Sequence, residues 1–336
     1  MGTGGKRLAE AFEDVSRMPA LAEARRRVLS ACASDSTSTA ELADMVESDA
    51  ALAIVVMRAA NNGGGPPART DGVIEAIEML EPAGVRATVS PVDTYDLLEQ
   101  PDSASQRHDR FRRHGVAVRH AAERIATIAR LPHQDQIAVA ALLHDIGRLV
   151  LVYLYGSEHG PDAAGYSPDE RARRERRELG IDHAVVGAVL IRRWDFPDEI
   201  ASAVERHHAA DAEGSAGAVR LADLIVHHCY GDPVPGESIR STAAGLGIDA
   251  EQLRTLIFEF PHLGRIRRPM AEPCPLSARE LDALRGLAQG KVYKEIADDL
   301  SLSASTVRTH LHNVYRKLGA IDRAQAVLIA RDRGWI

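Results

Sequence analysis

Seven residues of types that bind metal ions are spread along the chain, and two of them are adjacent in an apolar stretch. This pair, His144-Asp145, directly follows Leu142-Leu143 and precedes Ile146. Burying a histidine beside an aspartate is costly unless both find partners or bind a metal. Imidazole and carboxylate suit Mn, Fe or Zn, and two such ions can activate a water and clamp a phosphate. The other candidate ligands are His114, His183, His207, His208 and Asp223.

Several of these residues also have a purely structural interpretation. His144 could be a hydrogen-bonded core histidine. His207 and His208 could form a solvated cap at a helix end. The acid before His183 could be an N-cap. Asp223 lies in an apolar run and needs a partner. As an ordered series, the seven residues are harder to attribute to chance than any one of them.

The second group with a chemical role lies near the C-terminus. Ser277 and Glu280 form a capping box that predicts the start of a helix. A short helix over 293–300, a tight turn and a helix over 304–318 follow. Val307, Leu311, Val314 and Leu318 recur at helical spacing and predict the buried face of this last helix.

The opposite face of the helix over 304–318 is polar and basic. Two short helices, a tight turn and a helix of this kind are the geometry that enters a DNA major groove. Arg308 and His312 are one turn apart and could reach base edges. The predicted DNA-binding residues are Lys294, Ser305, Thr306, Arg308, Thr309, His312 and Lys317. The alternative is a helix-turn-helix used only for protein contacts.

The C-terminal segment closely resembles the LuxR/FixJ-type DNA-binding domain. The matching motifs are Lys294-Glu295-Ile296-Ala297, Ser305-Thr306-Val307-Arg308-Thr309-His310 and Lys317-Leu318-Gly319. The resemblance implies that Arg308, Thr309 and His312 take the base-reading positions. His312 stands where other polar residues often occur in the family, so it does not imply a target sequence.

The body of the chain resembles the HDOD domain, a branch of the HD superfamily of metal-dependent phosphohydrolases. The resemblance rests on Met18-Pro19-Ala20-Leu21, on the segments 46–53, 57–61, 113–118 and 142–150, and on later pieces up to Ala222-Asp223. It implies an all-helical regulatory domain of bacterial signalling proteins, often joined to an output module. This sequence also keeps a full set of candidate HD ligands.

The sequence departs from the HD-GYP phosphodiesterases at three places. No Gly-Tyr-Pro follows His208, Arg110 stands four residues before His114 in place of an acid, and Arg148 replaces the usual lysine. Cyclic-di-GMP hydrolysis is therefore not expected. A simpler nucleotide hydrolase, in which His144 and Asp145 are central ligands and Arg148 holds the phosphate, stays open.

Helices must position both groups of residues. Valine, isoleucine and threonine form no alternating runs and aromatic residues make up only 4%, so the sequence predicts an all-α fold. Helices are expected over about 110–130, 135–154, 182–194, 198–207 and 218–229. Residues 97–106 and 156–168 are expected as connections. The predicted organisation is an HDOD body over 8–260, a proline-rich linker over 261–275 and a four-helix LuxR-type module over 276–336.

Two basic stretches need an interpretation of their own. The run over 171–177 (RARRERR) is interleaved and flanked with acids, which predicts a solvated helix face with i,i+4 ion pairs. Arg110, Arg112 and Arg113 precede His114 and could instead meet a phosphorylated ligand.

Charge and composition restrict the class of protein. The net charge is −7, yet residues 275–336 hold ten Arg/Lys and seven Asp/Glu, so a basic module follows an acidic body. No uncharged apolar run approaches the ~20 residues of a membrane-spanning helix, and no secretory signal is evident. A cytoplasmic protein without a membrane partner is expected.

These features lead to two hypotheses of different classes. The first is a bacterial transcription regulator that binds promoter DNA as a homodimer, with an HDOD body that senses a signal such as a nucleotide or a metal. The second is a metal-dependent phosphohydrolase acting on a nucleotide or phosphodiester. A protein-interaction scaffold that has kept its histidines as relics is a third interpretation.

Overall fold

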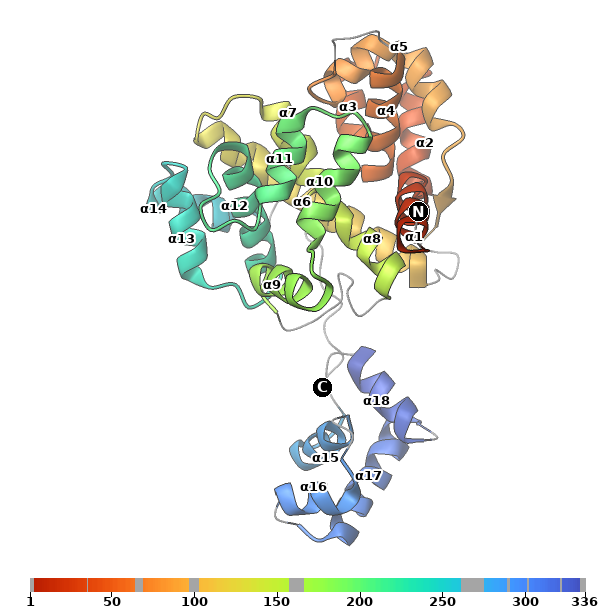
Figure 1. The fold of residues 1–336 in the computed structure, drawn as a ribbon, viewed down its shortest axis with the longest axis vertical. Helices are drawn as coiled ribbons and strands as arrows, with labels where there is room; N and C mark the ends of the chain where they lie inside the picture. The colour runs from red at the N-terminus through yellow and green to blue at the C-terminus, as the bar shows by residue number, and fades with distance from the viewer. Residues whose placement is uncertain are drawn as a thin grey trace. The chain divides into compact units, whose positions relative to one another are not determined.

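The computed structural model describes residues 3–34, 36–63, 69–96, 103–156, 166–260, 275–288, 291–300, 302–320 and 322–332. The chain divides into two compact units, Met1–Arg265 and Ile266–Ile336. Both are helical (Figure 1), which confirms the predicted all-α class. Nearly all of the predicted linker, residues 261–274, lies outside the described residues.

The first unit begins with a lobe of helices. Two short parallel strands, β1 (Ala20–Leu21) and β2 (Thr94–Tyr95), pair Ala20 with Thr94. They join the two ends of the lobe, because helices α2 to α5 lie between them in the chain. The helices of the lobe are α1 (Thr3–Ser16), α2 (Ala22–Ala31), α3 (Thr39–Val46), α4 (Ala50–Gly63) and α5 (Val73–Val89).

The rest of the first unit carries the candidate metal ligands. Its helices are α6 (Ser103–Ile128), α7 (Gln134–Leu143), α8 (Ile146–Tyr155), α9 (Pro168–Leu179), α10 (His183–Arg193), α11 (Asp198–Arg206), α12 (Gly214–Cys229), α13 (Gly236–Gly245) and α14 (Ala250–Glu259). Helix α6 packs against α7 and α12, and α10 packs against α8 and α11. One continuous apolar core joins the lobe to these helices.

The expectation of one helix over 135–154 is wrong, because the His144-Asp145 pair interrupts it. Helix α7 ends at Leu143, and Asp145 takes a non-helical backbone (φ −94°, ψ 6°) before α8 begins. The break turns both side chains toward the neighbouring helices. The expectation that residues 103–106 form a connection is also wrong, since α6 begins at Ser103.

By length and composition alone, the stretch Gln134–Tyr155 is apolar enough to cross a membrane, and 83% of its most apolar window is buried in the fold. Every residue of α7 from Gln136 to Leu143 is buried. Because it is buried in this way, the stretch is part of the core of the first unit. It also contains the buried Asp145–Arg148 ion pair.

The second unit contains the predicted helix-turn-helix. Its helices are α15 (Ala278–Ala288), α16 (Tyr293–Leu300), α17 (Ala304–Leu318) and α18 (Arg323–Asp332). Ser277 and Glu280 exchange the two hydrogen bonds of the predicted capping box. Val307, Leu311 and Val314 are buried in a separate small apolar core, as their spacing predicts.

Helices α8 and α10 meet backbone to backbone at Gly147. A Cβ atom there would overlap the carbonyl oxygen of His183 and lie 2.7 Å from the amide nitrogen of Gly187. Both of those atoms belong to the main chain, so neither can move away as a flexible side chain would. Glycine is therefore required for the separation at which these two helices pack.

We expect Gly147→Ala to lower the free energy of unfolding by about 1–3 kcal/mol or more, because α8 and α10 must separate. The matched control is Gly245→Ala at the end of α13, where a Cβ meets nothing within 4 Å. That change should leave stability unaltered or raise it by up to about 1 kcal/mol. Chemical denaturation of both variants measures the difference, and equal stability of the two would contradict the close contact.

Candidate metal centre and DNA-binding surface

The structure brings all seven predicted metal ligands into one cluster. They come from five places: α6 supplies His114, the α7–α8 break His144 and Asp145, the start of α10 His183, the end of α11 His207 and His208, and α12 Asp223. Among the described residues, the cluster contains three overlapping groups of three ligand atoms. Within each group, all three atoms lie within 4.8 Å of one another. The groups are His114/His144/Asp223, His144/Asp145/His207 and His183/His207/His208.

Contacts between the ligand atoms are short throughout this cluster. His114 Nε2 lies 3.1 Å from Asp223 Oδ1 and 3.3 Å from His144 Nε2. His183 Nε2 lies 3.1 Å from Asp145 Oδ1 and 3.0 Å from His208 Nε2. Ligand atoms that share one ion at about 2.1 Å have separations of about this size.

Four histidines direct Nε2 toward the cluster, because other groups contact their Nδ1 atoms. They are His144, His183, His207 and His208. His144 Nδ1 lies 2.8 Å from the carbonyl oxygen of Ala141, and His207 Nδ1 lies 2.6 Å from that of Val204. A carbonyl oxygen only accepts, so both Nδ1 atoms donate, and in the neutral ring the lone pair then lies on Nε2. His183 and His208 have carboxylates at Nδ1.

The donor set fits a metal ion, and His207 gives the clearest sign. Its side chain is fully buried, and its Nε2 has no hydrogen-bond partner among the described residues. A buried nitrogen with a lone pair and no donor nearby is costly unless a cation takes the lone pair. The interpretation of His207-His208 as a solvated helix cap is wrong for His207.

The protonation states of part of the cluster suit metal binding. Burial alone would raise the pKa of Asp145, but Arg148, His144 and His183 outweigh it and hold the pKa well below its usual range. Burial lowers the pKa of His114 to about 4 and that of His207 well below its usual value. Ionised carboxylates and neutral imidazoles are the forms that bind metals. For His144 and His183, neighbouring carboxylates outweigh burial and raise the pKa, so a metal ion would have to displace the protons of these two rings.

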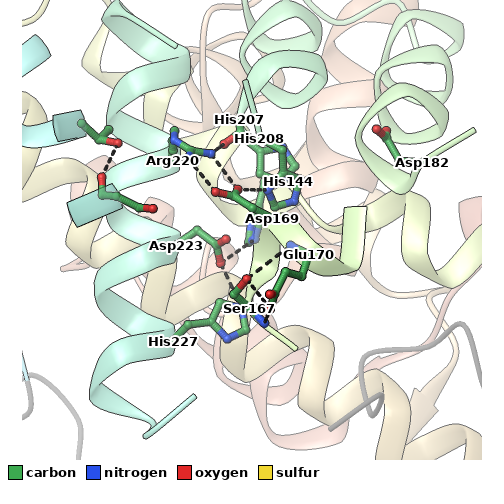
Figure 2. A network of polar contacts seen from close by, with 12 residues as sticks. His144, Ser167, Asp169, Glu170, Asp182, His207, His208, Arg220, Asp223 and His227 are labelled. Atoms are coloured by element: carbon green, nitrogen blue, oxygen red, sulfur yellow. Dashed lines mark hydrogen bonds and ion pairs between the residues drawn. The ribbon is translucent and has the colours of Figure 1, made fainter. Parts of the chain in front are cut away.

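Side chains behind the ligands were not found from the sequence. Glu175 accepts hydrogen bonds from Nδ1 (2.6 Å) and the backbone N–H (2.9 Å) of His183. Asp169 lies 3.2 Å from His208 Nδ1 and accepts a bidentate pair from Arg220 at 2.7 and 2.8 Å (Figure 2). These contacts orient the histidine rings.

His227 is a further member of the network that the sequence did not single out. Its Nε2 lies 3.2 Å from Asp223 Oδ1, and its Nδ1 lies 2.7 Å from Asp232 Oδ2. Figure 2 shows it beside Asp223 on α12. The i,i+4 spacing of Asp223 and His227 was the available signal, because residues four apart share a helix face.

The expectation for the first basic stretch is confirmed in part, since Arg173, Arg176 and Arg177 are exposed and Arg174 forms an i,i+4 ion pair with Glu178 at 2.8 Å. Within RARRERR, the interpretation as a solvated face is wrong for Arg171 and Glu175, which are buried on the inner face of α9. Ahead of His114, Arg112 and Arg113 both form ion pairs with the buried carboxylate of Asp109, at 2.9 and 2.7 Å. Their guanidinium groups are therefore already engaged within α6.

In the second unit, α17 presents the predicted polar face. Arg308, Thr309 and His312 are exposed. Ser303 caps the helix by accepting a hydrogen bond from the N–H of Thr306 at 3.1 Å. The rigid capped start of α17 fixes the direction in which these side chains project.

The remaining predicted DNA contacts lie around this helix. Lys294 is exposed on α16, and Ser305 and Thr306 lie in the first turn of α17. The Lys317 ammonium lies 2.6 Å from the Glu280 carboxylate, so it joins α17 to the capping box of α15. Lys317 thus has a structural role besides the predicted phosphate contact.

These features define a class: a helical body with a buried His–Asp cluster, followed by a helix-turn-helix module. The chain belongs to the HDOD domain family, whose model matches residues 18–210. Residues 274–330 match the model described as bacterial regulatory proteins, luxR family. Both resemblances inferred from the sequence are thereby confirmed.

Curated relatives match over limited segments. The nitrate/nitrite response regulator protein NarP of Escherichia coli is 36% identical over 99 residues, 29% of this chain and 45% of that protein. The probable transcriptional regulatory protein NarL of Mycobacterium tuberculosis is 46% identical over 65 residues, 19% of this chain and 30% of that protein. The chain thus spans less than half the length of either.

Solved structures share the fold over most of the chain. The MmoQ response regulator of Methylococcus capsulatus aligns with a TM-score of 0.54 and 22% identity, covering 72% of this chain and 98% of that one. A virulence factor of Campylobacter jejuni aligns with a TM-score of 0.55 and 14% identity, covering 80% and 99%. At these identities the likeness concerns the fold alone.

The His183–Glu175 pair predicts how stability depends on pH. Burial lowers the pKa of His183, but the Glu175 and Asp145 carboxylates outweigh it and raise the pKa from 6.5 to about 9. Folded His183 then keeps a proton that the unfolded chain releases. In the metal-free protein, this contribution is fully present below pH 6.5 and is lost as pH rises through about 9.

We expect Glu175→Gln to flatten this loss of stability, which amounts to at most about 3 kcal/mol. Urea denaturation between pH 6 and about 9.5, with a chelator present, measures the slope in both proteins. The control Glu205→Gln removes a partly exposed partner of Arg192 and should leave the slope unchanged. An equal slope in wild type and Glu175→Gln would show that Glu175 does not hold the proton on His183.

Proposed function

We propose that this chain is a cytoplasmic transcription regulator that binds promoter DNA through α17 and is controlled by its HDOD body. The observation that supports it is the exposed row of Arg308, Thr309 and His312 on a capped helix whose other face is buried. Guanidinium, hydroxyl and imidazole groups can read base edges in a major groove. Lys294 and the first turn of α17, with Ser305 and Thr306, then contact phosphates.

Control by the body follows from linkage between two conformations. A ligand changes the output only if it binds one conformation of the body more tightly than the other. The His–Asp cluster is the place for such a ligand, either a metal ion or a nucleotide held beside one. Helix-turn-helix proteins commonly read paired half-sites as dimers, so the active form is a homodimer.

DNA fragments selected by the wild-type chain from genomic DNA provide the assay. We expect Arg308→Ala combined with His312→Ala to lower the affinity for a selected fragment at least tenfold, because each base contact contributes about 1–3 kcal/mol. The control Arg285→Ala removes an exposed charge from α15 and should cost far less. Unchanged specific binding in the double variant, measured by fluorescence anisotropy, would contradict base reading by α17.

A second candidate function is hydrolysis of a nucleotide or phosphodiester. It is favoured by the convergence of seven ligand-type residues and by the partnerless Nε2 of His207. His144, Asp145 and Asp223 with the other four histidines would hold one or two ions of Mn, Fe or Zn. Such ions supply an activated water and a clamp on phosphate oxygens. Arg148, held by Asp145 at 2.8 Å, places a positive charge beside them.

Metal content per chain tests the cluster directly. Protein purified without chelator or a metal-binding tag should contain one or two ions. His144→Ala combined with Asp145→Ala should lose them, together with any nucleotide hydrolysis. The control His120→Ala changes a histidine of α6 whose side chain is 41% exposed, and it should keep the metal. A wild-type chain that stays metal-free after addition of Mn, Fe and Zn rules out the hydrolase and leaves a regulatory helical body.

A further inference from the structure

Arg171 is a largely buried residue whose guanidinium group has no partner among the described residues. Its residue is 7% exposed, and its side chain forms no hydrogen bond or ion pair within the part of the chain that the structure describes. The other three buried arginines of that part each contact a carboxylate: Arg119 contacts Glu47, Arg148 contacts Asp145 and Arg220 contacts Asp169. The Arg171 nitrogens are not among the buried polar atoms that lack a partner, so they reach the solvent. A guanidinium group that reaches solvent and has no ion pair can bind an anion from solution.

The position of Arg171 relates it to the His–Asp cluster. It lies one turn before Glu175 on the inner face of α9, and Glu175 holds the ring of His183. Burial and the neighbouring charge of Arg148 lower the pKa of Arg171, whereas the carboxylates of Asp145, Asp223 and Asp232 act in the opposite direction. Most of the charges that act on Arg171 thus belong to the cluster, and Asp232 is the partner of His227 beside it.

We propose that Arg171, with Arg148 as the neighbouring positive charge, binds the phosphoryl group of a small ligand at the His–Asp cluster. A phosphoryl oxyanion accepts two parallel N–H bonds from one guanidinium and relieves the repulsion between two. A phosphate carries up to two negative charges near pH 7, which suits two adjacent arginines better than a carboxylate does.

This inference deepens the second candidate function and rests on it for the identity of the site. It assigns a binding residue on α9 to the phosphoryl group of the ligand that this function already implies. The same chemistry is offered by inorganic phosphate and by a nucleoside monophosphate, so both serve as probes. Acetate, a carboxylate of single charge, serves as the comparison anion.

The test is calorimetric titration of the full chain with inorganic phosphate, then with a nucleoside monophosphate and acetate, with metal content measured on the same sample. Arg171→Met keeps the length of the side chain and removes its charge. We expect it to weaken phosphate binding at least tenfold at unchanged metal content. The matched control Arg177→Met lies on the same helix with a side chain 72% exposed and should bind phosphate like wild type.

Unfolding in the absence of phosphate separates a binding residue from a structural one. Because Arg171 forms no ion pair among the described residues and Arg148 is a neighbouring positive charge, Arg171→Met should leave the midpoint of thermal unfolding unchanged or raise it, whereas loss of a structural arginine would lower it. Should this variant fail to fold, Arg171→Lys keeps the charge but not the bidentate geometry, and its phosphate affinity should fall several-fold.

Three results would overturn the proposal. The first is a metal-loaded wild type that binds neither phosphate nor the nucleotide, and the second is equal affinity for acetate and phosphate. The third is wild-type phosphate binding by Arg171→Met, or by Arg171→Lys if only that variant folds. A wild type that binds phosphate but contains no metal would refute the hydrolase and keep Arg171 as part of an effector site. A nucleotide bound more tightly than phosphate identifies the nucleotide as the ligand.

Discussion

The arrangement of the His–Asp cluster in the first unit depends on the contacts of the Asp145 carboxylate. This carboxylate accepts a hydrogen bond from Arg148 at 2.8 Å and lies 3.1 Å from His183 Nε2 and 3.8 Å from His114 Nε2. It can do so because the helix breaks at His144 and Asp145, which places the side chain between α6, α8 and α10. Without the break, this carboxylate would lie on one face of a single long helix and could not contact Arg148, His183 and His114 together.

The two units are organised by different physics. The second has a small apolar core, with its polar residues on the surface or in caps. The first surrounds a set of buried charges with apolar helices, and several of these charges are held by groups from distant parts of the chain. Asp169 and Arg220, for example, are 51 residues apart and join α9 to α12 behind His208. Such a network costs stability relative to an apolar core, which is the usual sign of a functional site.

Much of this could be predicted from the sequence, because ligand residue types and apolar spacing are local signals. The helices over 293–300 and 304–318 and the buried face of α17 followed from spacing alone. The inner face of α9 did not, because the arginines and acids of RARRERR give the same pattern whether they face water or a buried histidine. Glu175 becomes informative only once His183, eight residues later, folds back onto it. The break at Asp145 is hidden for a similar reason: its partners come from other helices.

The contact between Gly147 and α10 has a mechanical consequence. At this point no layer of side chains lies between α8 and α10, so no rotamer change can absorb a displacement of one helix against the other. A displacement of the start of α8, where Asp145 lies, therefore displaces the start of α10, where His183 lies. A shift of Asp145 is thus coupled to a shift of α10 as a whole, and α11, which packs on α10, is the next helix to be displaced.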